Sequence, residues 1–286
     1  YKTGKLFYEL KNRHAGITAE RSAYEEALVR ALGKSWLNTD SESYFRFLVR
    51  FVSGEAIEAT TTEKGQYLIM CHLDLFDSAP GLASINELEV NLREVFEHSA
   101  IRQEVLDYLA YRLSQLECIE KPTSLKTPSV IKLHGRYSRN QILAGLSESS
   151  LERKASSREG VYRIKSMNTE LLFVTLYKTE GKFNASTMYH DYFINEQLFH
   201  WQSQNSTAPE SAVGQSYILQ QKSGKEVLLF VRESSSDENG STMAFVFCGK
   251  LHYLSHEGSK PMSITWRLES PPPAMLLNEG KKLAVG

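Results

Sequence analysis

The stretch Asn195-Glu-Gln-Leu-Phe-His-Trp-Gln-Ser-Gln-Asn-Ser-Thr207 joins an alternating segment to a run of uncharged polar residues. In its first half, Leu198 and His200 fall on one face and Phe199 and Trp201 on the other, a pattern that predicts a strand. An aromatic ring beside amides and hydroxyls is what recognition of a flat polar ligand requires. The alternative interpretation is a strand end and solvated loop, with Trp201 in the core.

The chain around this stretch, from residue 159 to 273, shows a hydrophobic period of two. Turn signals such as Ser223-Gly224 and Asn239-Gly240 separate its short apolar segments. Eight or nine short strands with no helices between them predict a mostly antiparallel β-barrel or β-sandwich. We expect residues 274–286 to form a loose tail.

Residues 1–148 show the helical period of 3.6 instead. Ser84, with Glu87 three residues later, is a predicted helix start, and Ser138 is a second predicted cap. Residues 149–158 are rich in Ser, Glu, Arg and Lys and are interpreted as a linker. The predicted fold class is therefore α+β, with an N-terminal helical subdomain followed by the β-rich domain.

Composition indicates a globular protein with a substantial core. The 286 residues are 41% hydrophobic and 10% aromatic, with a net charge of −1. No apolar run reaches the roughly 18 residues that a membrane-spanning helix requires, so no membrane association is expected. The widely separated Cys71, Cys118 and Cys248 predict buried thiols in a reducing cytoplasm. Because the first residue is Tyr1, we interpret the sequence as a piece of a longer chain.

The common catalytic motifs are absent from the sequence. It contains no phosphate-binding loop, dinucleotide fingerprint, nucleophile elbow or HExxH motif, so we predict no catalytic residues, cofactor or metal. The pairs His190-Asp191 and His252 with His256 leave a metal-dependent nuclease as an alternative, in which His200 would be essential.

Residues suited to binding DNA are easier to find. Arg136, Tyr137, Ser138 and Arg139 begin a short predicted helix, where backbone N–H groups and guanidinium groups can hold a phosphate. Amide side chains can pair bidentately with adenine edges. The other candidate DNA-binding residues in the β-rich half are Lys182, Asn184, Tyr189, His190, His200, Trp201, Gln202, Ser203, Gln204, Asn205 and Ser206.

Several segments in order resemble an uncharacterised domain at the C-terminus of bacterial superfamily-2 DEAD/DEAH-type helicases. Specific as a set rather than one by one, they include Leu133-His-Gly-Arg-Tyr-Ser-Arg-Asn-Gln-Ile-Leu-Ala-Gly-Leu146, Phe199-His-Trp-Gln-Ser-Gln-Asn205 and Pro261-Met-Ser-Ile-Thr-Trp266. Such proteins often carry a phospholipase-D-like nuclease domain. The resemblance implies a DNA-processing setting, in restriction or phage defence, with the helicase core and a nuclease domain as partners within the parent protein.

Three functional hypotheses follow. The first is a non-catalytic DNA-recognition module that reads duplex DNA or a modified or flipped base, with Trp201 or Tyr189 stacking on a flipped base. The second is a protein-interaction module that couples a helicase core to a partner. The third is the metal-dependent nuclease.

Overall fold

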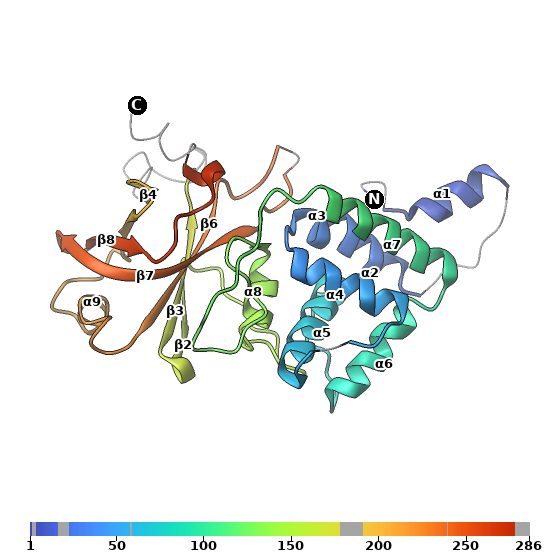
Figure 1. The fold of residues 1–286 in the computed structure, drawn as a ribbon, viewed down its shortest axis with the longest axis horizontal. Helices are drawn as coiled ribbons and strands as arrows, with labels where there is room; N and C mark the ends of the chain where they lie inside the picture. Colours follow the sequence, from blue (N-terminus) through green and yellow to red (C-terminus); the bar gives the residue numbers. More distant parts are fainter. Residues whose placement is uncertain (2–3, 17–22, 58, 178–190, 239, 278–286) are drawn as a thin grey trace. The chain divides into compact units, whose positions relative to one another are not determined.

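A computed structural model describes residues 1, 4–16, 23–57, 59–177, 191–238 and 240–277 of the chain. The chain divides into two compact units, Tyr1–Ser156 and Ser157–Gly286 (Figure 1). The division lies inside the segment that the sequence suggested as a linker. No helix in the described ranges is both long and apolar enough to cross a membrane.

Unit 1 is helical, as the sequence predicts. Its elements are α1 (Phe7–His14), α2 (Glu25–Arg30), the π-helical η1 (Ala31–Ser35), α3 (Trp36–Asn38), α4 (Glu42–Ser53), α5 (Thr61–Phe76), α6 (Ile85–Val95), α7 (Ser99–Ser114), β1 (Arg136–Tyr137) and α8 (Arg139–Gly145). Both predicted caps are confirmed, because Ser84 Oγ accepts from Glu87 N and Ser138 Oγ accepts from Gln141 N. These bonds satisfy N–H groups that a helix start otherwise leaves unpaired.

Residues 149–156, the first part of the predicted linker, pack against the helices of unit 1. Ser149 and Ala155 are buried. The carbonyl oxygen of Leu151 accepts from Gly81 N at 2.7 Å. Lys154 Nζ lies 2.6 Å from the carboxylate of Asp77, at the end of α5. The polar composition of the segment therefore reflects local hydrogen bonding as well as exposure.

Unit 2 is built on one mixed sheet. Its elements are β2 (Val161–Ile164), the 3₁₀ turn η2 (Lys165–Met167), β3 (Thr169–Thr175), β4 (Tyr192–Phe193), β5 (Leu198–Gln202), α9 (Ala212–Ile218), β6 (Glu226–Arg232), β7 (Phe245–Glu257) and β8 (Ser263–Leu268). The strand order is β2-β3-β6-β7-β8-β5-β4. Neighbours in this order run antiparallel, except that β3 and β6 are parallel.

The strands form one open sheet, which corrects the prediction of a β-barrel or β-sandwich, and α9 lies between β5 and β6 where no helix was predicted. Within the described residues, the terminal strands β2 and β4 do not pair with each other. Val161 on β2 and Phe193 on β4 nevertheless belong to the same buried cluster. Register shifts in the ladders of β7 with β6 and with β8 bend the long strand β7, as β-bulges do. The sheet is therefore curved around one core without closing.

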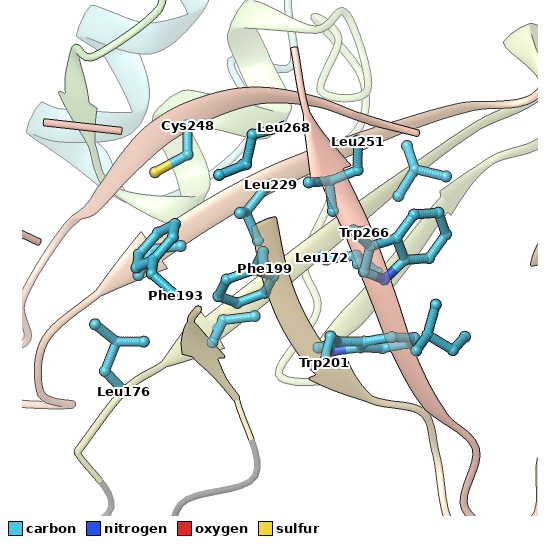
Figure 2. Close-up of a cluster of buried hydrophobic side chains, with 14 of the residues drawn as sticks. Leu172, Leu176, Phe193, Phe199, Trp201, Leu229, Cys248, Leu251, Trp266 and Leu268 are labelled. Carbon is cyan, nitrogen blue, oxygen red and sulfur yellow. The ribbon is translucent and has the colours of Figure 1, made fainter. Parts of the chain in front are cut away.

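The core of unit 2 is aromatic where α9 meets the sheet. Phe199, Trp201 and Trp266 point into the cluster from β5 and β8 (Figure 2). Tyr217 of α9 contacts both tryptophans edge-on, with ring centroids 5.5 Å from Trp201 and 5.9 Å from Trp266. Leu276 is also buried in this cluster, so the first residues of the predicted loose tail are part of the packed unit. Residues 278–286 lie outside the described residues.

Candidate nucleic-acid interface

Strand β5 has the alternation that its sequence predicts. Phe199 and Trp201 are buried, whereas Leu198, His200 and Gln202 are half-buried on the opposite face. Consecutive side chains of a strand point to opposite faces, so the aromatic core and the polar face come from one five-residue segment.

Trp201 belongs to the core and has no open face for a ligand. Its side chain is 5% exposed and packs against the ring of Trp266 (Figure 2). The ring of Tyr217 also contacts it, edge-on. A nucleobase could stack on this ring only by displacing part of the core. The core interpretation of Trp201 is therefore correct, and the expectation of a stacking plane at this residue is not met.

The polar residues after β5 form a turn that is fixed at both ends. Ser203 N donates to Met262 O at 2.9 Å, and Met262 N donates to Ser203 Oγ at 2.9 Å. At the other end, Lys260 N donates to Thr207 O at 3.0 Å. Ser203 and Thr207 are buried as a result. We call residues 203–207 the amide turn.

The tip of the amide turn presents three uncharged polar side chains, since Gln204, Asn205 and Ser206 are all exposed. Thr207 N donates to Gln204 O at 2.9 Å, which closes the backbone of the turn. Lys260, whose N–H group is bonded to the end of the turn, is also exposed. The arrangement offers donors and acceptors on a backbone that is ordered before any ligand binds.

The first turn of helix α9 packs against the chain directly after the amide turn. Gly214 approaches the backbone so closely that a Cβ atom there would collide with the carbonyl oxygen of Ala208. Ser211 caps the helix by accepting from Gly214 N. The amide turn is therefore packed against the N-terminal end of α9, and the glycine is required by contact rather than by its backbone angles.

His200 and Gln202 lie on the other face of the sheet from Trp201. The ring of His200 stacks on Tyr192 with centroids 4.8 Å apart. Gln202 N donates to the carboxylate of Asp191 at 2.9 Å. The same face carries Thr265 and the exposed Arg267 on the adjacent strand β8. These two predicted residues are thus separated from the core and belong to the outer face of β4, β5 and β8.

Residues of the predicted phosphate site at the start of α8 form ion pairs and hydrogen bonds with other residues of unit 1. Arg136 forms an ion pair with Glu117 at 2.7 Å, and the buried Tyr137 donates to Glu120 at 2.8 Å. Ser138 is engaged in a capping box with Gln141. Arg139 is half-buried in the first turn of the helix. Three of the four residues assigned to a phosphate, Arg136, Tyr137 and Ser138, therefore stabilise the local fold.

The structure does not test four candidates of the β-rich half. Lys182, Asn184, Tyr189 and His190 lie outside the described residues. Within the described ranges, no group of three or more His, Cys, Asp or Glu side chains is arranged to hold a metal ion. The side chains of Cys71, Cys118 and Cys248 are buried thiols, as predicted.

A buried ionic cluster in unit 2 was not found by sequence reasoning. Glu170 on β3 is fully buried and accepts from Tyr217 Oη at 2.5 Å. Its other oxygen lies 2.5 Å from Lys225 Nζ and 3.2 Å from Arg163 Nε. Burial lowers the pKa of Arg163, but the charge of Glu170 outweighs this effect, so the pKa is raised. The cluster ties α9 to β2, β3 and the start of β6.

Unit 1 has a buried carboxylate of its own. Asp74 on α5 accepts hydrogen bonds from Trp36 Nε1 at 2.9 Å, Tyr44 Oη at 2.8 Å and Gln141 Nε2 at 2.8 Å. Burial raises the pKa of Asp74 to about 7, although these hydrogen bonds act in the opposite direction. All three partners are themselves buried, so the network has a structural role in joining α3, α4, α5 and α8.

A comparison with known protein families identifies the family of the chain. None of the curated proteins compared matches the chain. A family model described as a domain of unknown function, DUF3427, matches residues 131–279. This match covers more than half of the 286 residues, and it includes β1, α8 and every strand of unit 2. The chain therefore belongs to the DUF3427 family.

Proposed function

We propose that the chain is a non-catalytic DNA-recognition module and that it reads duplex DNA with the amide turn of unit 2. The observation that carries the proposal is the turn itself. Its two ends are buried and bonded to residues 260 and 262, while Gln204, Asn205 and Ser206 project from it. Side chains held on an ordered backbone lose less conformational entropy on binding than those of a mobile loop.

The chemistry of the tip suits base edges in the major groove. An Asn or Gln amide can donate to and accept from adenine at the same time, and a Ser hydroxyl can serve either role. Each good bidentate pair contributes about 1–3 kcal/mol of discrimination against a wrong base. The burial of Trp201 favours reading of an unflipped duplex, because the aromatic ring beside the amides is not open to a base.

We place this module within a larger DNA-processing protein. The resemblance of the sequence to domains that follow helicase cores supports this setting. In such a protein the module would hold the motor on chosen DNA, and the helicase or nuclease chemistry would reside in other domains. This assignment to a restriction or defence enzyme rests on the resemblance alone.

The proposal can be tested by selection and binding. Duplexes enriched from a random pool by the whole chain would be compared with scrambled duplexes by fluorescence anisotropy. Gln204→Ala with Asn205→Ala should reduce the preference for the enriched sequence about tenfold or more, since each amide contributes about 1–3 kcal/mol.

The control is Gln197→Ala, which removes an exposed amide near the other end of β5. This variant should retain the wild-type preference. The proposal fails if the pool shows no enrichment, if no duplex binds at low salt, or if the control and the double variant lose the preference equally.

A further inference from the structure

Two loop segments contact each other near the C-terminal end of α9. One runs from Arg163 to Glu170, through η2, and the other covers residues 219–226. Asn168 Nδ2 donates to Ser223 O at 3.2 Å, and Glu226 N donates to Asn168 O at 3.0 Å. These bonds hold the two turns together as one surface at an end of the sheet.

The solvent-facing charges of this surface are positive. The two turns contain the basic residues Arg163, Lys165, Lys222 and Lys225 and the acidic residues Glu170 and Glu226. The side chain of Glu170 is 0% exposed and that of Glu226 is 4% exposed. In contrast, Arg163, Lys165 and Lys222 are exposed. We call these three exposed cations the basic patch.

The buried carboxylates also hold their own counter-ions. Glu170 pairs with Lys225, which is almost completely buried, and with the Nε atom of Arg163. Glu226 pairs with Lys250 at 3.6 Å. Both carboxylates are therefore paired inside the unit. Glu170 also holds the Nε atom of Arg163, although 44% of the Arg163 side chain remains exposed.

The basic patch and the amide turn lie at opposite ends of the same helix. Ala208, which directly follows the amide turn, packs against Gly214 at the N-terminal end of α9, and residues 219–226 follow its C-terminal end. A seven-residue helix is about 10 Å long. The length of this helix is comparable to the width of the major groove of B-DNA, which is about 12 Å from one phosphate strand to the other.

We propose that the basic patch binds the phosphodiester backbone of the DNA whose bases the amide turn reads, an inference that rests on the proposed function. Phosphate contacts fix register and orientation, and base contacts specify sequence. Under this division of roles, Arg163, Lys165 and Lys222 position the duplex, while Gln204 and Asn205 choose the sequence.

The salt dependence of binding separates the two roles. Each phosphate neutralised contributes about 0.9 to the slope of log K against log salt for duplex DNA. Lys222→Gln and Lys165→Gln should each lower the slope by about 0.9 and weaken binding equally for enriched and scrambled duplexes. Both side chains are exposed, so the variants should keep the wild-type circular dichroism spectrum and urea midpoint.

The matched control is Arg267→Gln, which removes one exposed cation from the outer face of β8. It should leave the slope unchanged. The inference is overturned if Arg267→Gln lowers the slope and the two lysine variants do not, because the backbone would then cross the outer face of the sheet.

Other outcomes separate this inference from the proposed function. If the lysine variants leave the slope unchanged while the Gln204/Asn205 variant loses sequence preference, only the basic patch is refuted. If the lysine variants lower the slope while the amide variant has no effect, the patch is supported and sequence reading by the turn is refuted. Titration with inorganic phosphate checks whether the basic patch binds the phosphate groups of the duplex. If inorganic phosphate saturates the protein without displacing the duplex, the two ligands do not share a site and the inference is refuted.

Discussion

Replacement of Trp201 distinguishes a core residue from a base-stacking residue. The side chain is 5% exposed, and an aromatic side chain buries about 150–250 Å² on folding. At about 25 cal/mol per Å², this burial corresponds to about 4–6 kcal/mol, close to the 3–5 kcal/mol typical of Trp→Ala substitutions. We therefore expect Trp201→Ala to reduce the free energy of unfolding of unit 2 by about 4 kcal/mol.

Urea titration followed by far-UV circular dichroism measures this loss. With a slope of about 2 kcal/mol per molar urea, the midpoint should fall by about 2 M. Trp201→Phe keeps a ring against Tyr217 and Trp266, so its loss should be about 1–2 kcal/mol. Trp201→Phe can therefore remain folded and be assayed for DNA binding.

Duplex binding by Trp201→Phe decides between the two roles. A core residue predicts an affinity within about twofold of wild type at temperatures where the variant is folded, because no contact to DNA is lost. A stacked base contributes about 1–3 kcal/mol to binding. If Trp201 stacked on a base, the smaller ring of Phe would replace only part of this contribution, and the affinity for the duplex would fall by more than twofold. An unchanged urea midpoint together with a large loss of binding would refute the assignment of Trp201 to the core.

Two further variants test the buried charges. Lys225→Met leaves the buried Glu170 with fewer counter-ions and should lower the free energy of unfolding, measured by urea titration, by about 3–5 kcal/mol. Adding Glu170→Gln should recover much of this loss. An unchanged stability of Lys225→Met alone would contradict the pairing. The pKa of Asp74 is about 7 in the folded state and lies above its unfolded value of about 3.9, so its contribution to stability is complete below about pH 4 and is lost as pH rises through 7. The free energy of unfolding should therefore fall between about pH 4 and 7 in the wild type and fall less in Asp74→Asn, and equal falls in both proteins would refute the raised pKa.

Local patterns predicted much of the fold. Alternation assigned Phe199 and Trp201 to the opposite face from His200, and the cap signals at Ser84 and Ser138 located two helix starts. Each of these predictions depends on residues within a few positions of one another. The closed barrel was wrong because closure depends on how the first and last strands meet, and the register shifts that bend β7 have no signal in a period of two.

The candidate site shows the same limit. The exposed tip Gln204–Ser206 could be proposed from its sequence, because a polar run after a strand predicts a loop. The role of Arg136 was not predictable in this way, since its partner Glu117 lies outside the motif that suggested a phosphate site. Glu170 gave no signal either, because Tyr217 and Lys225 reach it only after the strands and α9 have packed.

The position of Gln141 has a consequence for how the DUF3427 region is inherited. The family match begins at residue 131 and so includes α8, but the Gln141 side chain donates to Asp74 and Thr39, which precede the match. A polypeptide shortened to start at residue 131 would retain the amide of Gln141, fully buried in the intact chain, without these acceptors. In this chain the buried amide of Gln141 therefore depends on acceptors from the preceding helical segment. The region matched by the family, residues 131–279, therefore begins inside unit 1 and does not coincide with either compact unit of this chain.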